Sequence, residues 1–161
     1  MNSMDALSGS DYAALALFRF RLRAFLRVSE ELAREAGVEP QHHQLMLTLR
    51  GLGKDDTASV ADLASWLQLR HHSVVELVDR AVERHLVARH PDPADARRVL
   101  VTLTEHGDET LAALSRRHRG ELRVSGPQLL EALRQLLEDL PSTPLVPTGD
   151  LPTPHASRIQ S

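Results

Sequence analysis

The sequence predicts a mainly α-helical protein with one small β-hairpin. Its 161 residues are 42% hydrophobic but only 3% aromatic, so the core must consist mostly of Leu, Val and Ala, a composition that favours helices. Apolar residues recur with helical spacing along most of the chain. Only residues 86–90 and 97–103 alternate as strands do, and the Pro- and Asp-rich segment between them is typical of a hairpin loop.

A long first helix is expected at residues 11–36. Ser10 or Asp11 can cap its start, and Gly37 can end it in a left-handed conformation. Its apolar stripe is longer than one small core would cover, which suggests contact with a second subunit. The stripe consists of Leu15, Phe18, Leu22, Phe25 and Leu32.

A second helix follows from Pro40 to about Arg50, with Leu45, Met46 and Leu49 facing inward. Residues 51–57 have the composition of a turn. Ser59 and Asp62 then form a capping-box pattern that begins a short third helix.

The turn at residues 68–69 separates the third helix from a fourth at about residues 70–85. The predicted inward stripe of this fourth helix is Val74, Leu77, Val78, Ala81 and Val82. After the hairpin, Thr104 caps a fifth helix that runs to about Val124. Gly126 and Pro127 are expected to end it and to separate it from a sixth helix. That helix carries Leu129, Leu130, Leu133, Leu136, Leu137 and Leu140.

We expect one domain at residues 11–140, with flexible segments on either side at 1–10 and 141–161. The second segment is rich in proline and has no helical period. No apolar run is long enough to span a membrane and no signal peptide is evident, so a soluble cytoplasmic protein without a membrane partner is expected.

Several classes of activity are excluded by residues that the chain lacks. Without cysteine there can be no disulfide, thiolate nucleophile or zinc–thiolate site. The sequence has no glycine-rich phosphate loop, nucleophile elbow or metalloprotease helix. We therefore expect neither an enzyme nor a cofactor.

Two short helices joined by a tight turn and followed by a hairpin match a winged helix–turn–helix, which would occupy about residues 40–104. In that arrangement the second helix of the pair enters the DNA major groove by its N-terminal end. That end is polar here, although any solvated helix end can look the same. The polar residues are Arg70, His71, His72, Ser73 and Glu76.

The stretch from Ser59 to Gly107 resembles the signature of the MarR family of bacterial transcriptional regulators. Matching segments are residues 59–64, 73–80 and 92–104. The most specific part is Asp95-x-Arg97 followed by the Val-x-Leu-Thr end of the second strand. The flanking helices occur in the matching order, so the resemblance covers about residues 11–140.

The resemblance implies a homodimer that binds a pseudo-palindromic operator in double-stranded DNA. The helices at about 11–36 and 104–140 would form its dimerisation half. Arg97 would reach into the minor groove, Asp95 would hold the Arg97 guanidinium, and Arg98 would contact phosphate or its own hairpin. Asp95 and Arg97 could instead be an ordinary surface ion pair. A repressor released by a small-molecule effector is the function expected from the resemblance.

Two features of the expected recognition helix depart from a basic DNA reader. Glu76 would be repelled by phosphate, although it could accept a hydrogen bond from cytosine or pair with Arg80 one turn later. We favour the pairing. His71 and His72 could contact phosphate or a base edge, more strongly when protonated.

Three other interpretations concern ligands and partners. Tyr12, Phe25, His43 and Met46 could line an effector pocket, although ordinary core positions explain them equally well. The nine histidines lack ligand spacing, so no metal site is assigned and a His-based metal-responsive regulator remains an alternative. Residues 66–98 contain six arginines and five carboxylates, and this near balance leaves open a winged helix that binds protein partners.

Overall fold

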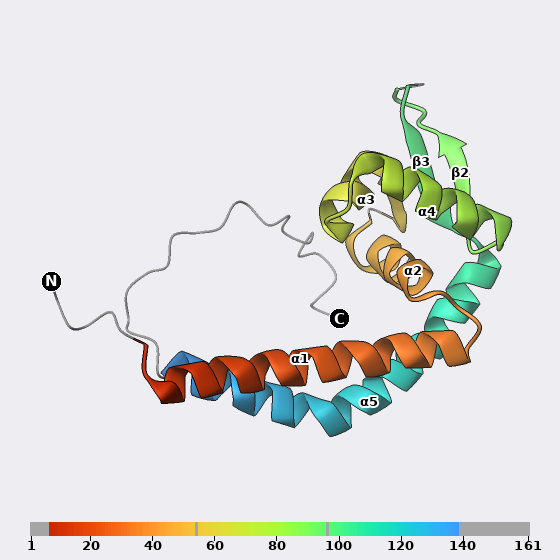
Figure 1. The fold of residues 1–161 in the computed structure, drawn as a ribbon. Coiled ribbons are helices and arrows are strands. Elements are labelled where there is room, and N and C mark those ends of the chain that lie inside the picture. The colour runs from red at the N-terminus through yellow and green to blue at the C-terminus, as the bar shows by residue number, and fades with distance from the viewer. Residues whose placement is uncertain (1–6, 54, 96, 139–161) are drawn as a thin grey trace, which may run out of the picture.

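The computed structural model describes residues 7–53, 55–95 and 97–138. Figure 1 shows two parts, an arm and a helical body that carries a hairpin. The arm consists of α1 (Gly9–Glu35) and α5 (Glu105–Glu138), which lie side by side. The body contains α2 (Pro40–Leu52), β1 (Thr57–Ser59), α3 (Val60–Leu67), α4 (His71–Glu83), β2 (Val87–Pro91) and β3 (Val99–Leu103). The predicted mainly α-helical fold with a small hairpin is confirmed.

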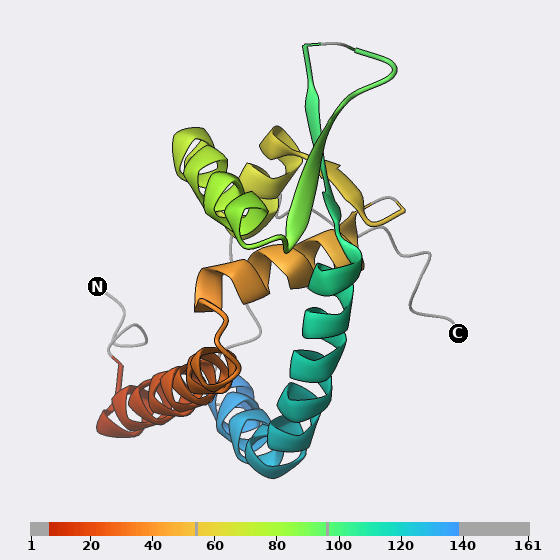
Figure 2. The same ribbon diagram turned by 90° about the vertical axis from the view of Figure 1, so that its right-hand side faces the viewer.

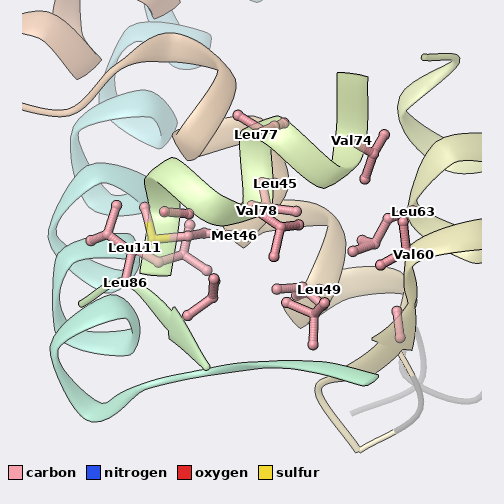
Figure 3. Close-up of a cluster of buried hydrophobic side chains, with 14 of the residues drawn as sticks. Leu45, Met46, Leu49, Val60, Leu63, Val74, Leu77, Val78, Leu86 and Leu111 are labelled. Carbon is pink, nitrogen blue, oxygen red and sulfur yellow. The ribbon is translucent and has the colours of Figure 1, made fainter. Parts of the chain in front are cut away.

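The core lies where α2, α3, α4 and the start of α5 meet (Figure 3). Fully burying one Leu or Val side chain contributes about 1.5–3 kcal/mol, so this cluster fixes how the helices of the body pack. The inward stripes predicted for α2 and α4 are confirmed, except that Val82 is only partly buried. The buried side chains at the centre are Leu45, Met46, Leu49, Leu63, Val74, Leu77 and Val78.

Helix α1 begins earlier than the sequence pattern predicted. Ser8 is its N-cap: the Ser8 hydroxyl accepts the Asp11 N–H, while the Asp11 carboxylate accepts the Ser8 N–H at 2.6 Å. The prediction that Ser10 or Asp11 caps the helix was wrong, because Asp11 serves as the third residue of a capping box. Gly37 follows the helix with φ +73°, the left-handed conformation that was expected.

The hairpin is part of a three-stranded antiparallel sheet in the order β1-β3-β2. In β3, Val101 is opposite Ala58 on one side and Arg89 on the other. The strand β1 was not predicted. Three residues are too few to show the alternation of a strand, and the first of them, Thr57, was assigned to a turn. This strand anchors the hairpin to the start of α3.

Helix α5 runs through Gly126 and Pro127, so the predicted break into two helices was wrong. Proline removes one backbone hydrogen bond and crowds the preceding turn, which bends a helix more often than it ends one when both halves are packed. Figure 2 shows α5 changing direction between its teal first half and its blue second half. The second half stays attached to α1, where Arg21 Nη1 donates to Gln128 Oε1 at 2.6 Å and Ala132 is buried.

The predicted flexible tail at 141–161, Leu140 and residues 1–6 lie outside the described residues. Residues 9 and 10, which were expected to be flexible, belong to α1. Within the described part of the chain, no helix is both long and apolar enough to cross a membrane.

Candidate nucleic-acid interface

The turn between α3 and α4 sets the direction of the two helices. Ser59 caps α3: its hydroxyl accepts the Asp62 N–H at 3.1 Å, and the Asp62 carboxylate accepts the Ser59 N–H, as the capping-box pattern predicted. Gln68 then takes a left-handed conformation with φ 54°. This conformation ends α3 and lets α4 start three residues later, at His71, at an angle to it.

The start of α4 is open to solvent. Arg70 is the N-cap residue, but no side chain caps the helix there. The first N–H groups of a helix carry partial positive charge and attract anions. His71 and His72 are exposed and Ser73 is half-buried, so the predicted polar block does lie on the surface.

Further along α4, Glu76 and Arg80 are also exposed, on the side away from the core. The predicted ion pair between them was wrong, because the structure shows no hydrogen bond or salt bridge between these two described side chains. An exposed i,i+4 pair contributes only a few tenths of a kcal/mol, which does not by itself order two long side chains.

The loop of the hairpin is held by local hydrogen bonds. Asp92 Oδ1 accepts the Ala94 N–H at 2.8 Å, and Asp95 Oδ1 accepts the Arg97 N–H at 3.0 Å. The predicted contact of Asp95 with the Arg97 guanidinium was therefore wrong: the short Asp side chain binds the backbone two residues on. Asp95 shapes the loop rather than orienting the Arg97 side chain.

Arg98, rather than Arg97, makes the ion pairs at the base of the loop. Its Nε lies 3.7 Å from Asp92 Oδ2, and its Nη2 lies 3.7 Å from Asp62 Oδ2 in α3. Arg97 is exposed, and its guanidinium makes no hydrogen bond or ion pair with any described residue. The two neighbouring arginines thus differ, one tied to the protein and one directed to solvent.

Arg89 is a residue of this surface that the sequence analysis did not single out. From β2 its Nη1 lies 2.5 Å from Asp79 Oδ1, and its Nη2 donates to the Val75 carbonyl at 3.1 Å. Both partners are on α4, so Arg89 fixes the hairpin against that helix. The alternation of residues 86–90 indicated a strand, but nothing in the local pattern identified a partner fourteen residues away.

These groups surround one concave site between α3, α4 and the hairpin. The cavity has a volume of about 290 Å³. It combines three arginines and a histidine with small apolar side chains, so it suits an anionic partner with some apolar surface. Its walls are Ser59, Val60, Ala61, His71, Val75, Arg89, Arg97, Arg98 and Val99.

The four residues predicted to line an effector pocket do not come together. His43 and Met46 are buried in the body, with exposed fractions of 3% and 0%. Phe25 is half-buried on α1, whereas Tyr12 is 61% exposed near the N-terminal end of that helix. The prediction of a common wall was wrong because the length of α1 separates Tyr12 from the body.

Two of the histidines, His42 and His43, lie in the interior. His42 is fully buried, and His43 stacks on His118 of α5 with ring centroids 4.4 Å apart. Burial, and to a smaller extent the charge of His118, lowers the pKa of His43 to about 4. No group of three or more His, Asp or Glu side chains that could hold a metal ion occurs within residues 7–53, 55–95 and 97–138.

Comparison with known proteins finds a matching family model and similar solved structures. Residues 36–98 match the model of the MarR family. No curated protein sequence matches the chain. Among solved structures, the MarR family transcriptional regulator AbsC of Streptomyces coelicolor superposes with a TM-score of 0.71 at 22% identity, over 84% of this chain and 92% of AbsC.

Two structures determined with DNA are also similar. A mutant MarR of E. coli in complex with operator DNA gives a TM-score of 0.62 at 19% identity, over 85% of this chain and 100% of that one. A MepR mutant of S. aureus bound to an oligodeoxyribonucleotide gives 0.59 at 18% identity, over 83% and 98%. The chain therefore has the winged helix–turn–helix fold of these structures, and residues 36–98 match the model of the MarR family.

Proposed function

We propose that the protein is a homodimeric transcription regulator that binds double-stranded DNA with α4 and the β2–β3 hairpin. The observation that carries this proposal is the shared concave face on which the exposed start of α4 meets Arg97 and Arg98 of the hairpin. A helix that presents its N-terminal end can enter the major groove, while an Arg at a hairpin tip can reach the adjacent minor groove.

The distribution of charge on this face supports an anionic partner despite the net charge of −3. The carboxylates of Asp79 and Asp92 lie against Arg89 and Arg98. The guanidinium groups of Arg70, Arg80 and Arg97 make no hydrogen bond or ion pair with any described residue. The surface therefore offers cations that phosphate could bind without first breaking an ion pair.

Dimerisation through the arm is the second part of the proposal. Exposed large apolar side chains concentrate on α1 and α5, and clusters of this kind mark interaction surfaces. Within residues 7–53, 55–95 and 97–138, only Leu47 and Val99 lie away from the arm and its N-terminal approach. The exposed residues of the arm and its N-terminal approach are Leu7, Tyr12, Leu15, Leu17, Phe20, Leu26, Leu122, Val124, Leu130 and Leu137.

Operator DNA in the related MarR complex and the oligodeoxyribonucleotide on MepR support the same choice of partner. Such a regulator would act in the cytoplasm. Repression, and release from DNA by a small molecule, stay predictions from the family resemblance. A winged helix that binds protein partners is the competing function, and the following experiment separates the two.

The test uses a duplex that the purified protein selects, with Arg97→Ala as the probe and Arg84→Ala as the matched control. Both variants remove one exposed arginine, but Arg84 follows the opposite end of α4 and faces Glu39 at 3.2 Å. We expect Arg97→Ala to weaken binding about tenfold and to lower the salt dependence by about one phosphate contact. We expect Arg84→Ala to stay within about twofold of the parent protein.

Equal effects of the two substitutions would contradict the assignment of the hairpin to DNA. Absence of duplex binding at low salt would contradict the proposed function itself and favour the protein-binding alternative.

A further inference from the structure

His118 lies at the junction of three helices and reaches two backbone carbonyls. Its Nδ1 is 2.8 Å from the Leu114 oxygen, one turn earlier on α5, and its Nε2 is 3.0 Å from the Ser29 oxygen on α1. The ring of His43, from α2, stacks on it with an angle of 24° between the planes. Ser29 and His43 are both buried, whereas His118 is half-buried between them.

The two carbonyls determine which charge state of His118 fits. A carbonyl oxygen can only accept a hydrogen bond, and a neutral imidazole carries a single N–H. Only the imidazolium, with an N–H on each nitrogen, can donate to Leu114 and Ser29 together. Loss of the proton leaves one ring nitrogen facing a carbonyl oxygen with no hydrogen between them, which is unfavourable where the site is shielded from water.

The two histidines of α2 near this contact do not supply a positive charge in place of the His118 proton. Burial, and then the charge of His118, lowers the pKa of His43 to about 4, so the stacked ring is neutral near pH 7. Burial also lowers the pKa of His42, against the opposing effect of Glu39. The neutral His43 ring therefore brings no positive charge to the contact with His118.

Most of the charged groups of the arm around His118 have partners. Arg117 Nη2 lies 2.5 Å from Glu35 Oε2 on α1, and Arg117 Nη1 donates to the Leu32 carbonyl at 3.4 Å. Glu121, three residues after His118 on α5, is half-buried, and its carboxylate makes no hydrogen bond or ion pair with any described residue. The remaining carboxylates of this part of α1 pair along the helix, Glu30 with Arg34 and Glu31 with Arg27.

We propose that His118 is a proton-operated latch between α1 and α5. The charged ring ties the two helices through Ser29, and the neutral ring gives up one of its two bonds and loosens the arm. Since the latch belongs to a single chain and involves no DNA, its test stands apart from that of the proposed function.

The first experiment measures the free energy of unfolding between pH 5 and pH 8.5 in a His43→Phe background. Phenylalanine keeps a ring against His118 but removes the titration of His43. Within this background, His118→Gln substitutes an amide that cannot gain a proton. We expect the unfolding equilibrium constants of parent and variant to diverge by a further fivefold or more as the pH falls from 8.5 to 5.

His106→Gln is the control, because His106 is an exposed histidine in the first turn of the same helix. This variant should show no such divergence. A difference in the free energy of unfolding between the His118→Gln variant and its parent that is the same at all pH values would overturn the proposal.

The second experiment needs no substitution and decides the matter if the His118→Gln variant does not fold. Long-range proton–nitrogen NMR spectra of the unaltered protein report whether each ring nitrogen carries hydrogen. We expect both His118 nitrogens to carry hydrogen at pH 5 and only one at pH 8.5. A His118 ring that is neutral at every pH at which the protein is folded would overturn the latch.

Discussion

Replacing Gly107 with alanine should destabilise the protein, even though alanine favours helices. Gly107 lies in the first turn of α5, directly against the backbone of Leu86. An added Cβ would lie 2.9 Å from the Leu86 carbonyl carbon and 3.3 Å from its Cα, and it would collide with the carbonyl oxygen. That oxygen also accepts the Thr104 N–H at 3.2 Å, and the Thr104 hydroxyl donates to His85. The backbone that would have to move is therefore held from two sides.

The magnitude follows from two opposing effects. Non-bonded carbon atoms are normally about 3.5–4.0 Å apart, so the start of α5 and the start of β2 must separate by roughly 1 Å. Forcing an extra carbon into a packed site costs about 1–3 kcal/mol, whereas alanine gains at most about 1 kcal/mol over glycine in a helix. We expect Gly107→Ala to lower the free energy of unfolding by about 1–2 kcal/mol.

Gly120→Ala is the matched control, since the same substitution in the same helix adds a Cβ with nothing within 4 Å. It should raise stability by up to about 1 kcal/mol. Urea unfolding followed by circular dichroism, at one fixed protein concentration, measures both variants. A Gly107→Ala protein at least as stable as the parent, beside a stabilised Gly120→Ala protein, would refute the argument.

Two further predictions concern stability. His43 binds a proton at about pH 6.5 in the unfolded chain but only at about pH 4 in the folded protein, so stability should fall as the pH drops through this window, by up to about 3 kcal/mol. In urea titrations at several pH values His43→Phe should lose less stability over this window, and an unchanged loss would contradict the assignment. Ser59→Ala removes the α3 cap and should cost about 1 kcal/mol by the same urea assay; a cost within measurement error would contradict the role of the capping box.

Features fixed by neighbours in the chain could be predicted from the sequence. The Ser59–Asp62 capping box, the left-handed Gly37 and the buried stripe of α4 depend on residues within one or two turns. Side-chain type and spacing are therefore enough to identify them. The exposure of the start of α4 could be predicted from the same stripe, because the α4 residues that lie outside the buried stripe face solvent.

Features that depend on distant partners could not be predicted. Pro127 was expected to end α5, but packing of the following half on α1 keeps it helical. Arg89 acts through α4, and His118 acts through Ser29, 89 residues away. These contacts form only after the helices and the hairpin have packed.

Selection of bound sequences from a pool of random DNA duplexes tests the central claim most directly. Two copies of the chain, each placing α4 in a major groove, should enrich an inverted repeat whose half-sites are centred about 10 base pairs apart or a multiple of that. The enriched duplex should bind less tightly as salt rises, in proportion to the number of phosphate contacts. Failure to enrich any sequence over the starting pool, or enrichment of a single half-site only, would contradict the account of a dimeric DNA-binding regulator.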